Sequence, residues 1–390
     1  MGDKIERDFA MTLGRRALRL FAGFAALAWA ALASTDALTR PLPTSTLEID
    51  RVLKLVADWQ LKHAPIGPAL DSEQETGWVQ AAFYVGLARL AATSDDPHYF
   101  DIIRQVGTRN NWRLGERSYH ADDQLIGQVY VAAFDHYTDR DMISPMVAQF
   151  DQILAGKPDV KLVFDESHSC QQRWCWCDAL FMAPASWMAV SRITGVPRYR
   201  DFADSEFWAT KEFLFDRKDH LFYRDSRFFD RRGRDGKKIF WARGNGWVFA
   251  GLVNILRELP PDDPGRKRYE ALFVEMAAML AKRQRRDGFW SASLLSRPAS
   301  SAPESSGTAL VTYGMASGIN LGLLDRRRFE RSARRGWNAL VGAVNAEGRL
   351  GRVQPIGDRP SAVRVDDYQF YGSGAFLLAG TAIKAMIKSP

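Results

Sequence analysis

Apolar side chains recur with a helical period along most of this chain, and no other feature of the sequence restricts the possible folds as strongly. Little of the chain alternates between apolar and polar residues as a half-buried strand does. The fold class is therefore expected to be all-α. The pattern predicts about twelve helices, over residues 47–62, 75–93, 97–109, 122–137, 140–155, 178–194, 197–215, 243–258, 266–285, 307–323, 326–346 and 370–387.

The links between these helices are unequal in a regular way. The links that leave the second, fourth, sixth and tenth helices need only two or three residues, whereas most links into the even-numbered helices are long. Short turns at one end and long loops at the other are what six helical hairpins closed into a ring require, an (α/α)6 barrel. The even-numbered helices carry fewer charges and are expected to form the inner layer. An irregular bundle or a solenoid is the alternative that periodicity leaves open.

An uncharged run near the start of the chain predicts export. The run from Leu20 to Ala33 ends in small residues and is short for a bilayer span, so residues 1–33 are expected to be a secretory signal peptide. It follows the arginines Arg15, Arg16 and Arg19. An uncleaved anchor and a twin-arginine signal remain alternatives. We expect a bacterial periplasmic protein with no membrane span after the signal peptide.

The rest of the chain has the charge balance of an ordinary globular protein. Lys and Arg number 53 against 46 Asp and Glu, which leaves a net charge of +7 over 390 residues. This excess is mild, and the sequence has no helix-turn-helix, zinc-finger or stacking-sheet pattern, so no nucleic-acid partner is expected. No composition break divides the chain, which predicts a single domain over residues 40–390.

The three cysteines, Cys170, Cys175 and Cys177, lie in one short segment. An oxidising compartment would allow one disulfide, with Cys170 as the favoured participant and one thiol left over. A zinc site is the alternative, but the spacing fits no common zinc pattern and none of the six His residues stands beside the thiols. Neither a metal nor a cofactor is expected.

Polar and aromatic residues that are unusual in a helical core stand at the starts of the even-numbered helices, so a closed ring would turn them all toward one mouth. The exposed N–H groups of six helix N-termini would favour an anionic ligand there. Taken singly, each polar residue has the alternative of a local N-cap, and this is favoured for Ser306 and Thr308. The full set is Trp78, Asp122, Asp123, Asp178, Arg243, Asn245, Trp247, Ser306, Thr308 and Tyr371.

Asp122 and Asp178 are the candidates for chemistry. Asp178 stands in an apolar and aromatic setting, Trp174-Cys-Trp-Cys-Asp178-Ala-Leu-Phe-Met182, where a carboxylate without a role would be costly. Burial and a second carboxyl group both raise a carboxyl pKa, so the pair could hold a proton near neutral pH, as glycosidases require. The HExxH, GxSxG and Walker motifs of other enzyme classes are absent from the sequence.

Five ordered blocks, which run from about residue 75 to the C-terminus, resemble the unsaturated rhamnogalacturonyl hydrolases. They are His120-Ala-Asp122-Asp123-Gln-Leu-Ile-Gly127-Gln128, Trp176-Cys-Asp178-Ala-Leu-Phe-Met182-Ala-Pro184, Phe240-Trp241-Ala-Arg243-Gly-Asn245-Gly-Trp247, Glu304-Ser-Ser-Gly307-Thr308-Ala and Tyr371-Gly-Ser-Gly374-Ala-Phe-Leu-Leu-Ala-Gly380. The resemblance implies the (α/α)6 barrel that the helix pattern predicts independently.

The resemblance also implies an exo-acting hydrolase that removes a 4,5-unsaturated galacturonyl residue from the non-reducing end of pectin-derived oligosaccharides. In that chemistry an aspartic acid protonates C4 of the vinyl ether, and water adds at C5. By motif position Asp178 would be this acid and then the base for water. Asp122 would be the partner carboxylate, with Asp123 as the other candidate.

The substrate-binding residues implied by the resemblance are aromatic or basic. Arg243 would bind the uronate carboxylate and Trp247 would stack on the sugar, with Trp78, Trp241, Tyr371 and Asn245 as further parts of the subsite. Some members place a His ahead of the Arg243 block, where this chain has Leu221-Phe-Tyr-Arg224. The preferred sugar beyond the unsaturated residue therefore stays open.

Two alternatives accompany this hypothesis. The first is an unsaturated glucuronyl hydrolase acting on glycosaminoglycan, ulvan or gellan fragments, which the sequence does not separate from the pectin enzyme. The second is a catalytically silent carbohydrate-binding protein of the same shape. The presence of both Asp122 and Asp178 favours an enzyme over the binding protein.

Overall fold

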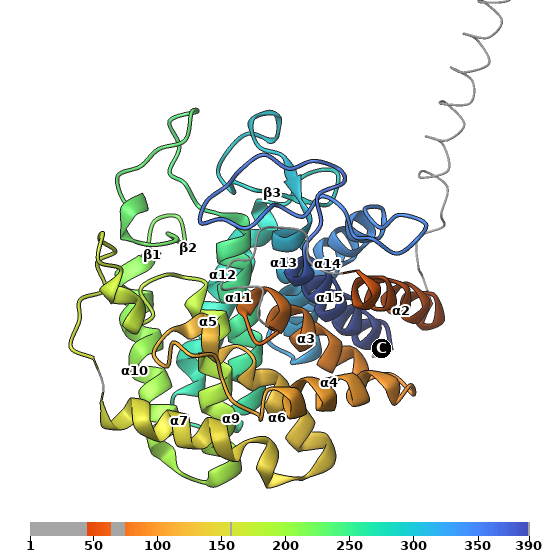
Figure 1. The fold of residues 1–390 in the computed structure, drawn as a ribbon. Coiled ribbons are helices and arrows are strands. Elements are labelled where there is room, and N and C mark those ends of the chain that lie inside the picture. The colour runs from red at the N-terminus through yellow and green to blue at the C-terminus, as the bar shows by residue number, and fades with distance from the viewer. Residues whose placement is uncertain (1–44, 64–74, 157, 389–390) are drawn as a thin grey trace, which may run out of the picture. The chain divides into compact units, whose positions relative to one another are not determined.

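The computed structural model describes residues 45–63, 75–156 and 158–388. In this part of the chain six inner helices alternate in sequence with six outer ones (Figure 1). The inner helices are α3 (Trp78–Ala91), α6 (Gly127–Tyr137), α9 (Pro184–Thr194), α11 (Ala242–Glu258), α13 (Ser305–Asn320) and α15 (Phe370–Lys388). The outer helices are α2 (Thr46–Lys62), α4 (His98–Arg109), α7 (Ser144–Ala155), α10 (Pro197–Leu214), α12 (Arg266–Lys282) and α14 (Arg326–Val341).

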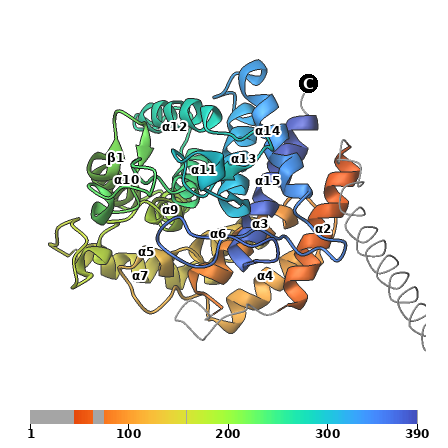
Figure 2. The same cartoon turned by 90° about the horizontal axis from the view of Figure 1, so that it is seen from above.

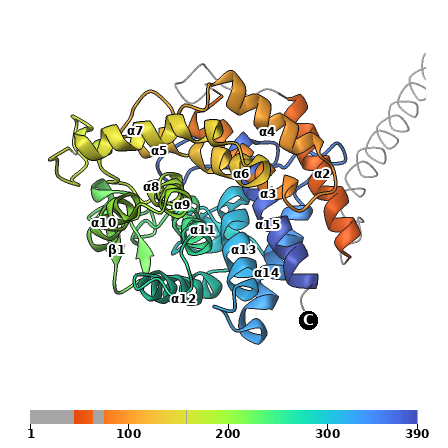
Figure 3. The same ribbon diagram turned by 90° about the horizontal axis from the view of Figure 1, so that it is seen from below.

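The inner helices form a closed ring. Each packs against the next along the chain, from α3 through α6, α9, α11 and α13 to α15, and α15 packs back on α3 (Figure 2). The outer helices cover this ring, which the view from the other end also shows (Figure 3). The contact between α15 and α3 excludes an open solenoid. The prediction of an (α/α)6 barrel is confirmed.

The links alternate as the sequence predicts. Links from an inner helix to the next outer helix are short, and those from an outer to an inner helix are long, so the loops that precede α11, α13 and α15 gather at the top of Figure 1. The short links are 92–97, 138–143, 195–196, 259–265 and 321–325. The longer ones within the described residues are 110–120, 158–178, 215–241, 283–304 and 342–369.

Several helix boundaries differ from the prediction. The helices expected at 122–137 and 178–194 each start with a separate short helix, α5 (Ala121–Gln124) and α8 (Ala179–Met182), and these two pack on each other. The break after α8 falls at Pro184, whose ring nitrogen has no hydrogen to continue the helix. The helix expected to reach 346 ends at Val341, and Gly342 follows as its C-cap.

The long loops contain short elements. Two antiparallel ribbons pair Phe215 with Phe222 and Trp290 with Glu304. Their strands are β1 (Phe215–Asp216), β2 (Leu221–Phe222), β3 (Trp290–Ser291) and β4 (Pro303–Glu304). The 3-10 helices are η3 (Arg140–Met142), η4 (Ser169–Gln172), η5 (Ser226–Phe228) and η6 (Pro298–Ser300).

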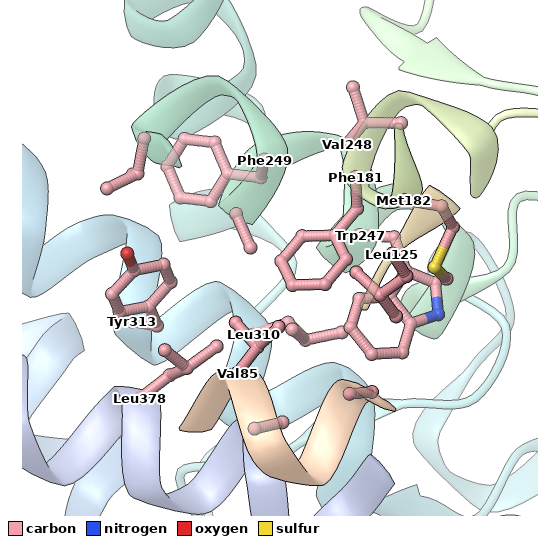
Figure 4. Packing of buried hydrophobic residues seen from close by; sticks show 14 of the residues in the cluster. Val85, Leu125, Phe181, Met182, Trp247, Val248, Phe249, Leu310, Tyr313 and Leu378 are labelled. Atoms are coloured by element: carbon pink, nitrogen blue, oxygen red, sulfur yellow. The ribbon is translucent and has the colours of Figure 1, made fainter. Parts of the chain in front are cut away.

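Large side chains fill the centre of the ring. Figure 4 shows Phe181 of α8, Trp247 of α11, and Leu310 and Tyr313 of α13 among the side chains that pack there. The barrel is therefore packed, and a ligand has to bind at an end of it. The helix α15 is long and apolar enough to span a membrane, but 89% of that stretch is buried inside the protein, as expected of a core helix.

The described residues from 45 onward belong to one compact unit. The predicted signal peptide, residues 1–33, lies outside the described residues.

Candidate active site

A cavity of about 320 Å³ lies where the starts of several inner helices meet the long loops. Four of the residues singled out from the sequence line it: Trp78, Asp122, Asp178 and Trp241. The grouping of helix-start residues around one mouth, expected from a closed ring, is thus found for Trp78, Asp122 and Asp178, while Trp241 was expected there from the family resemblance. The other lining residues are Trp176, Met182, Arg224, Ile356, Gly357 and Asp358.

Asp122 lies in the first turn of α5, and its side chain does not cap that helix. The N-cap is His120, whose Nδ1 accepts a hydrogen bond of 3.3 Å from the backbone N–H of Asp122. Burial, and then the charge of Asp178, raise the pKa of Asp122 to about 7, against the opposing charges of Arg117 and Arg224. A carboxyl group in this state holds its proton in a good share of molecules at neutral pH.

Asp178 occupies the N-cap position of α8 but makes no capping hydrogen bond with its side chain. Its Oδ2 accepts a hydrogen bond of 3.4 Å from the Cys177 thiol and lies 3.6 Å from Nε of Arg224. Burial raises the pKa of Asp178, although the charges of Arg224 and Arg243 act in the opposite direction. Asp122 and Asp178 therefore both favour the protonated form more than an exposed aspartate does.

Asp123, the other candidate for the partner carboxylate, supports the loop before α5. It accepts hydrogen bonds from the backbone N of Arg117 at 2.8 Å and from its Nε and Nη2 at 3.0 and 2.6 Å. It does not line the cavity. The geometry therefore favours Asp122 as the partner of Asp178.

Arg243 does not contact the cavity, contrary to its expected role as the carboxylate-binding residue. Its side chain is fully buried, with the guanidinium carbon 4.4 Å from the Trp241 ring centre and 4.6 Å from that of Tyr371. It donates to the carbonyl oxygens of Gln354 and Pro355, at 2.7 and 3.0 Å. Arg243 thus packs against Trp241, which lines the cavity, without reaching the cavity itself.

Tyr371 belongs to the same supporting layer. Its hydroxyl donates to the Gln354 carbonyl at 2.5 Å and accepts a hydrogen bond of 3.0 Å from Arg243. Its ring stacks on Trp78, with centres 5.1 Å apart. The side chains lie in the order Trp241, Arg243, Tyr371 and Trp78. This layer fixes Trp78 and Trp241, two of the three tryptophans that line the cavity.

Asn245 and Trp247 have structural positions as well. The Asn245 amide pairs with the backbone of Phe222 through bonds of 2.8 and 3.0 Å, which fastens β2 to α11. Trp247 is 1% exposed and packs on Phe181 in the barrel centre (Figure 4). This geometry does not support the expected stacking of Trp247 on a sugar, nor a direct sugar contact by Asn245.

The N-cap expected at Ser306 or Thr308 is provided by Glu304 instead. Its carboxylate accepts hydrogen bonds from the backbone N of Ser306 at 2.8 Å and of Gly307 at 2.6 Å. It also accepts one of 3.0 Å from the backbone N of Gln354, so the start of α13 is tied to the loop before α15. The prediction was wrong because a longer side chain one position before the helix reaches the same N–H groups.

The disulfide prediction is confirmed, since Cys170 is bonded to Cys175 and Cys177 stays a free, buried thiol. The bridge lies just ahead of Asp178. Across the described residues no group of three or more His, Cys, Asp or Glu side chains is arranged to hold a metal. The expectation that no metal or cofactor takes part stays a prediction.

Six lining residues were not singled out from the sequence. Trp176 had a signal, because it lies two positions before Asp178 in a resemblance block. Arg224 lies in the segment that differs from the family pattern. That difference drew attention to the segment, but it did not indicate what Arg224 does. Ile356, Gly357 and Asp358 belong to a long loop with no pattern, and only the fold brings that loop to the mouth.

A larger cavity of about 560 Å³ lies at the opposite ends of α3, α6, α9 and α11. Four acidic residues line it, Asp95, Asp96, Asp135 and Glu258, and the last two are both paired with Arg192, at 3.1 and 2.8 Å. Burial raises the pKa of Glu258, but the two aspartates identified from the sequence, Asp122 and Asp178, line the smaller cavity, which is therefore the candidate active site.

The chain is similar to known proteins along most of its length. Residues 52–387 match the family model described as Glycosyl Hydrolase Family 88. An unsaturated 3S-rhamnoglycuronyl hydrolase of Alteromonas sp. (strain LOR) is 38% identical over 361 residues, which cover 88% of this chain and 87% of that protein. A protein of the same name from Formosa agariphila is 35% identical over 345 residues, with coverages of 86% and 90%. The solved structure of a glycosyl hydrolase family 88 protein from Bacteroides vulgatus is 26% identical, with a TM-score of 0.78, and the match covers 88% of this chain and 99% of that chain.

Proposed function

The chain belongs to glycosyl hydrolase family 88, and from this premise we propose that it is an exo-acting enzyme that removes 4,5-unsaturated galacturonyl residues from lyase-generated rhamnogalacturonan or pectin oligosaccharides. At the level of the family it is a glycoside hydrolase that acts on unsaturated uronates. The resemblance drawn from the sequence is confirmed at this level. Export to a bacterial periplasm remains our proposal from residues 1–33.

One observation carries the proposal: Asp122 and Asp178 line the same small cavity, and both have raised pKa values. We assign Asp178 as the acid that delivers its proton to C4 of the vinyl ether. Water then forms a bond to C5, and its proton passes to the Asp178 carboxylate, which restores the acid. The resulting hemiketal opens to a ketone at C5, and the hemiacetal left at C1 releases the linked sugar.

The exo mode of action is proposed from the size of the cavity. A volume of about 320 Å³ is at the small end of ligand pockets, which suits one terminal sugar better than a polymer passing through. Trp78, Trp176 and Trp241 would provide its flat apolar walls.

The names of the relatives favour a second candidate substrate, an unsaturated rhamnoglycuronyl oligosaccharide. Both curated relatives are named unsaturated 3S-rhamnoglycuronyl hydrolases. Galacturonate and glucuronate differ at C4, and that stereocentre is lost when a lyase forms the C4–C5 double bond. The unsaturated ring is then the same from either polymer apart from the configuration of its C1 linkage, so that linkage and the sugar attached to it distinguish the two substrates.

The test follows the ultraviolet absorbance of the conjugated uronate over time. Purified protein is mixed separately with lyase digests of rhamnogalacturonan, oligogalacturonan, ulvan and gellan and with unsaturated glycosaminoglycan disaccharides. Loss of absorbance establishes hydration of the vinyl ether, and the fastest substrate identifies the linked sugar. We expect the rhamnose-linked substrates to be the fastest. A folded sample that leaves every absorbance unchanged would contradict the proposal.

A further inference from the structure

The proposed substrate carries a carboxylate, and the cavity needs a positive charge to accept it. Its ionisable lining residues are Asp122, Asp178, Asp358 and one guanidinium, that of Arg224. Burial would raise the pKa of Asp358, but hydrogen bonding to Arg359 and the charges of nearby arginines hold it below its ordinary value, so Asp358 stays ionised. An anionic sugar would be repelled unless a cation met its carboxylate directly.

Arg243 cannot supply this charge from its observed position. It lies between two aromatic rings and donates to Gln354, Pro355 and Tyr371 behind the wall. Among the described residues that line the cavity, Arg224 is the one basic side chain.

Arg224 is held beside Asp178 by its own backbone. Its carbonyl oxygen accepts a hydrogen bond of 2.8 Å from the backbone N of Cys177, the residue next to Asp178. Its Nη1 donates to Oδ2 of Asp225 at 2.8 Å. Asp225 is fully buried and is itself held by Nε and Nη2 of Arg227, at 2.9 and 2.8 Å. One edge of the guanidinium is thereby fixed.

The opposite edge of the guanidinium is available. Nε of Arg224 is buried and has no hydrogen-bond partner among the described residues, and the nearest carboxylate oxygen, Oδ2 of Asp178, is 3.6 Å away. A buried donor without an acceptor is costly unless a ligand supplies the acceptor. A carboxylate matches the planar fork of a guanidinium.

We propose that Arg224 binds the carboxylate of the terminal unsaturated uronate through its Nε edge, in addition to pairing with Asp178. This inference rests on the proposed function and names the group that recognises the charge of the substrate. In the free protein Arg224 opposes the rise that burial causes in the pKa of Asp178. A bound carboxylate shares that positive charge, so Asp178 gains a stronger preference for its proton when the substrate is present.

The experiment compares the unsaturated disaccharide as its free acid with the same disaccharide as its uronate methyl ester, which has no charge. Initial rates for wild type, Arg224→Gln and Arg224→Lys give kcat and KM for both substrates, with circular dichroism and thermal unfolding as checks of folding. Arg227→Gln is the matched control, because Arg227 binds the same Asp225 and does not line the cavity. Comparing ratios between proteins removes the intrinsic difference in reactivity between acid and ester.

Arg224→Gln should lower kcat/KM for the acid by about 30-fold or more, as for a buried charge pair that loses one partner, with KM the more affected constant. Its rate on the ester should stay within about threefold of wild type, since the uncharged ester does not bind through the positive charge of Arg224. Arg227→Gln should keep the acid-to-ester ratio of wild type. The alkaline limb of kcat/KM should move to higher pH in Arg224→Gln, because Asp178 loses its counter-ion.

Equal losses on acid and ester in a folded Arg224→Gln protein would overturn the inference and leave Arg224 with a purely structural role. If that variant does not fold, Arg224→Lys decides, since it retains the charge and loses the fork: a selective loss on the acid supports the inference and an equal loss overturns it. Wild-type protein that processes neither substrate would contradict the proposed function, and this inference with it.

Discussion

At the residue scale, Asp122, Asp123 and Asp178 show how surroundings assign different roles to one side-chain type. Asp123 accepts hydrogen bonds from Arg117 and supports a loop. Asp122 and Asp178 have little hydrogen bonding and are buried together, which raises both pKa values. Asp122, with a pKa of about 7, can release and recover a proton near neutral pH, and burial makes Asp178 favour its protonated form.

The role of Asp178 as the acid is tested by Asp178→Asn. The two side chains have the same shape, so the thermal midpoint should change by no more than a few degrees. Turnover should fall by about 10²–10⁴-fold, since the first step loses its proton donor. The assay is the initial loss of uronate absorbance. Asp123→Asn serves as control and should lower turnover by less than about tenfold at 25 °C. A folded Asp178→Asn protein with near wild-type turnover would reassign the first proton transfer to Asp122.

The raised pKa of Asp122 has a consequence for stability against pH. Because its pKa of about 7 in the folded protein lies above the ordinary 3.8, folding favours the protonated form. The stabilising contribution is complete below about pH 4 and is lost as the pH rises through 7. Asp122→Asn removes the charge that would have to be buried. Its advantage over wild type in the free energy of unfolding in urea should be about 2 kcal/mol larger at pH 8 than at pH 5.

Asp123→Asn is the control for this pH dependence. It removes acceptors that Arg117 uses at both pH values, so it should destabilise the protein at pH 5 and at pH 8. A difference between Asp122→Asn and wild type that does not change with pH would show that the Asp122 carboxyl is not buried in the way described.

At the element scale, the approach of α3 to α15 closes the ring, and it depends on two glycines. Gly86 of α3 faces the backbone of Gly374 of α15, and a Cβ on either residue would collide with backbone atoms of the other helix. Backbone atoms cannot move aside as a flexible side chain can. The two helices therefore have to separate if either position gains a side chain.

Gly86→Ala should lower the free energy of unfolding by about 1–3 kcal/mol, even though Ala is the better helix former. Gly342→Ala is the matched control, because a Cβ there would have its nearest neighbours at an ordinary 3.5 Å, and the variant should be neutral or slightly more stable. Thermal and urea unfolding measure both. A Gly86→Ala protein as stable as wild type would show that the crossing is looser than the structure has it.

At the scale of the whole molecule, a closed ring gives every inner helix two inner neighbours. An open solenoid would have ends that could unfold separately, whereas a closed ring has none. The described tryptophans are spread around the barrel, among them Trp59 in α2, Trp187 in α9 and Trp337 in α14.

Urea unfolding followed by tryptophan fluorescence and by circular dichroism should therefore give a single transition with the same midpoint. Fluorescence reports the packing around the tryptophans, and circular dichroism reports the helices throughout. Separate midpoints, or a second transition in either signal, would indicate that one part of the ring unfolds before the rest.

The sequence by itself determined the number and layers of the helices, because apolar periodicity is set by neighbouring residues three and four positions apart. It also placed Trp78, Asp122 and Asp178 at one mouth, since all three stand at or beside the starts of inner or short helices and the link lengths order those starts at one end. The participation of Cys170 in a disulfide was expected from the three cysteines in one short segment, whereas its partner, Cys175, was decided by the structure.

The tertiary structure alone decided which basic residue faces the cavity. Arg243 lies in the first turn of α11, and Arg224 lies in the loop before that helix. The sequence around the two residues does not indicate which of them faces the cavity. Arg243 is turned away by carbonyl groups at Gln354 and Pro355 and by Tyr371, more than a hundred residues along the chain. Arg224 is turned inward by Cys177 and Asp225. The direction of a side chain at a helix start depends on loops that come from elsewhere in the sequence, and local periodicity contains no information about them.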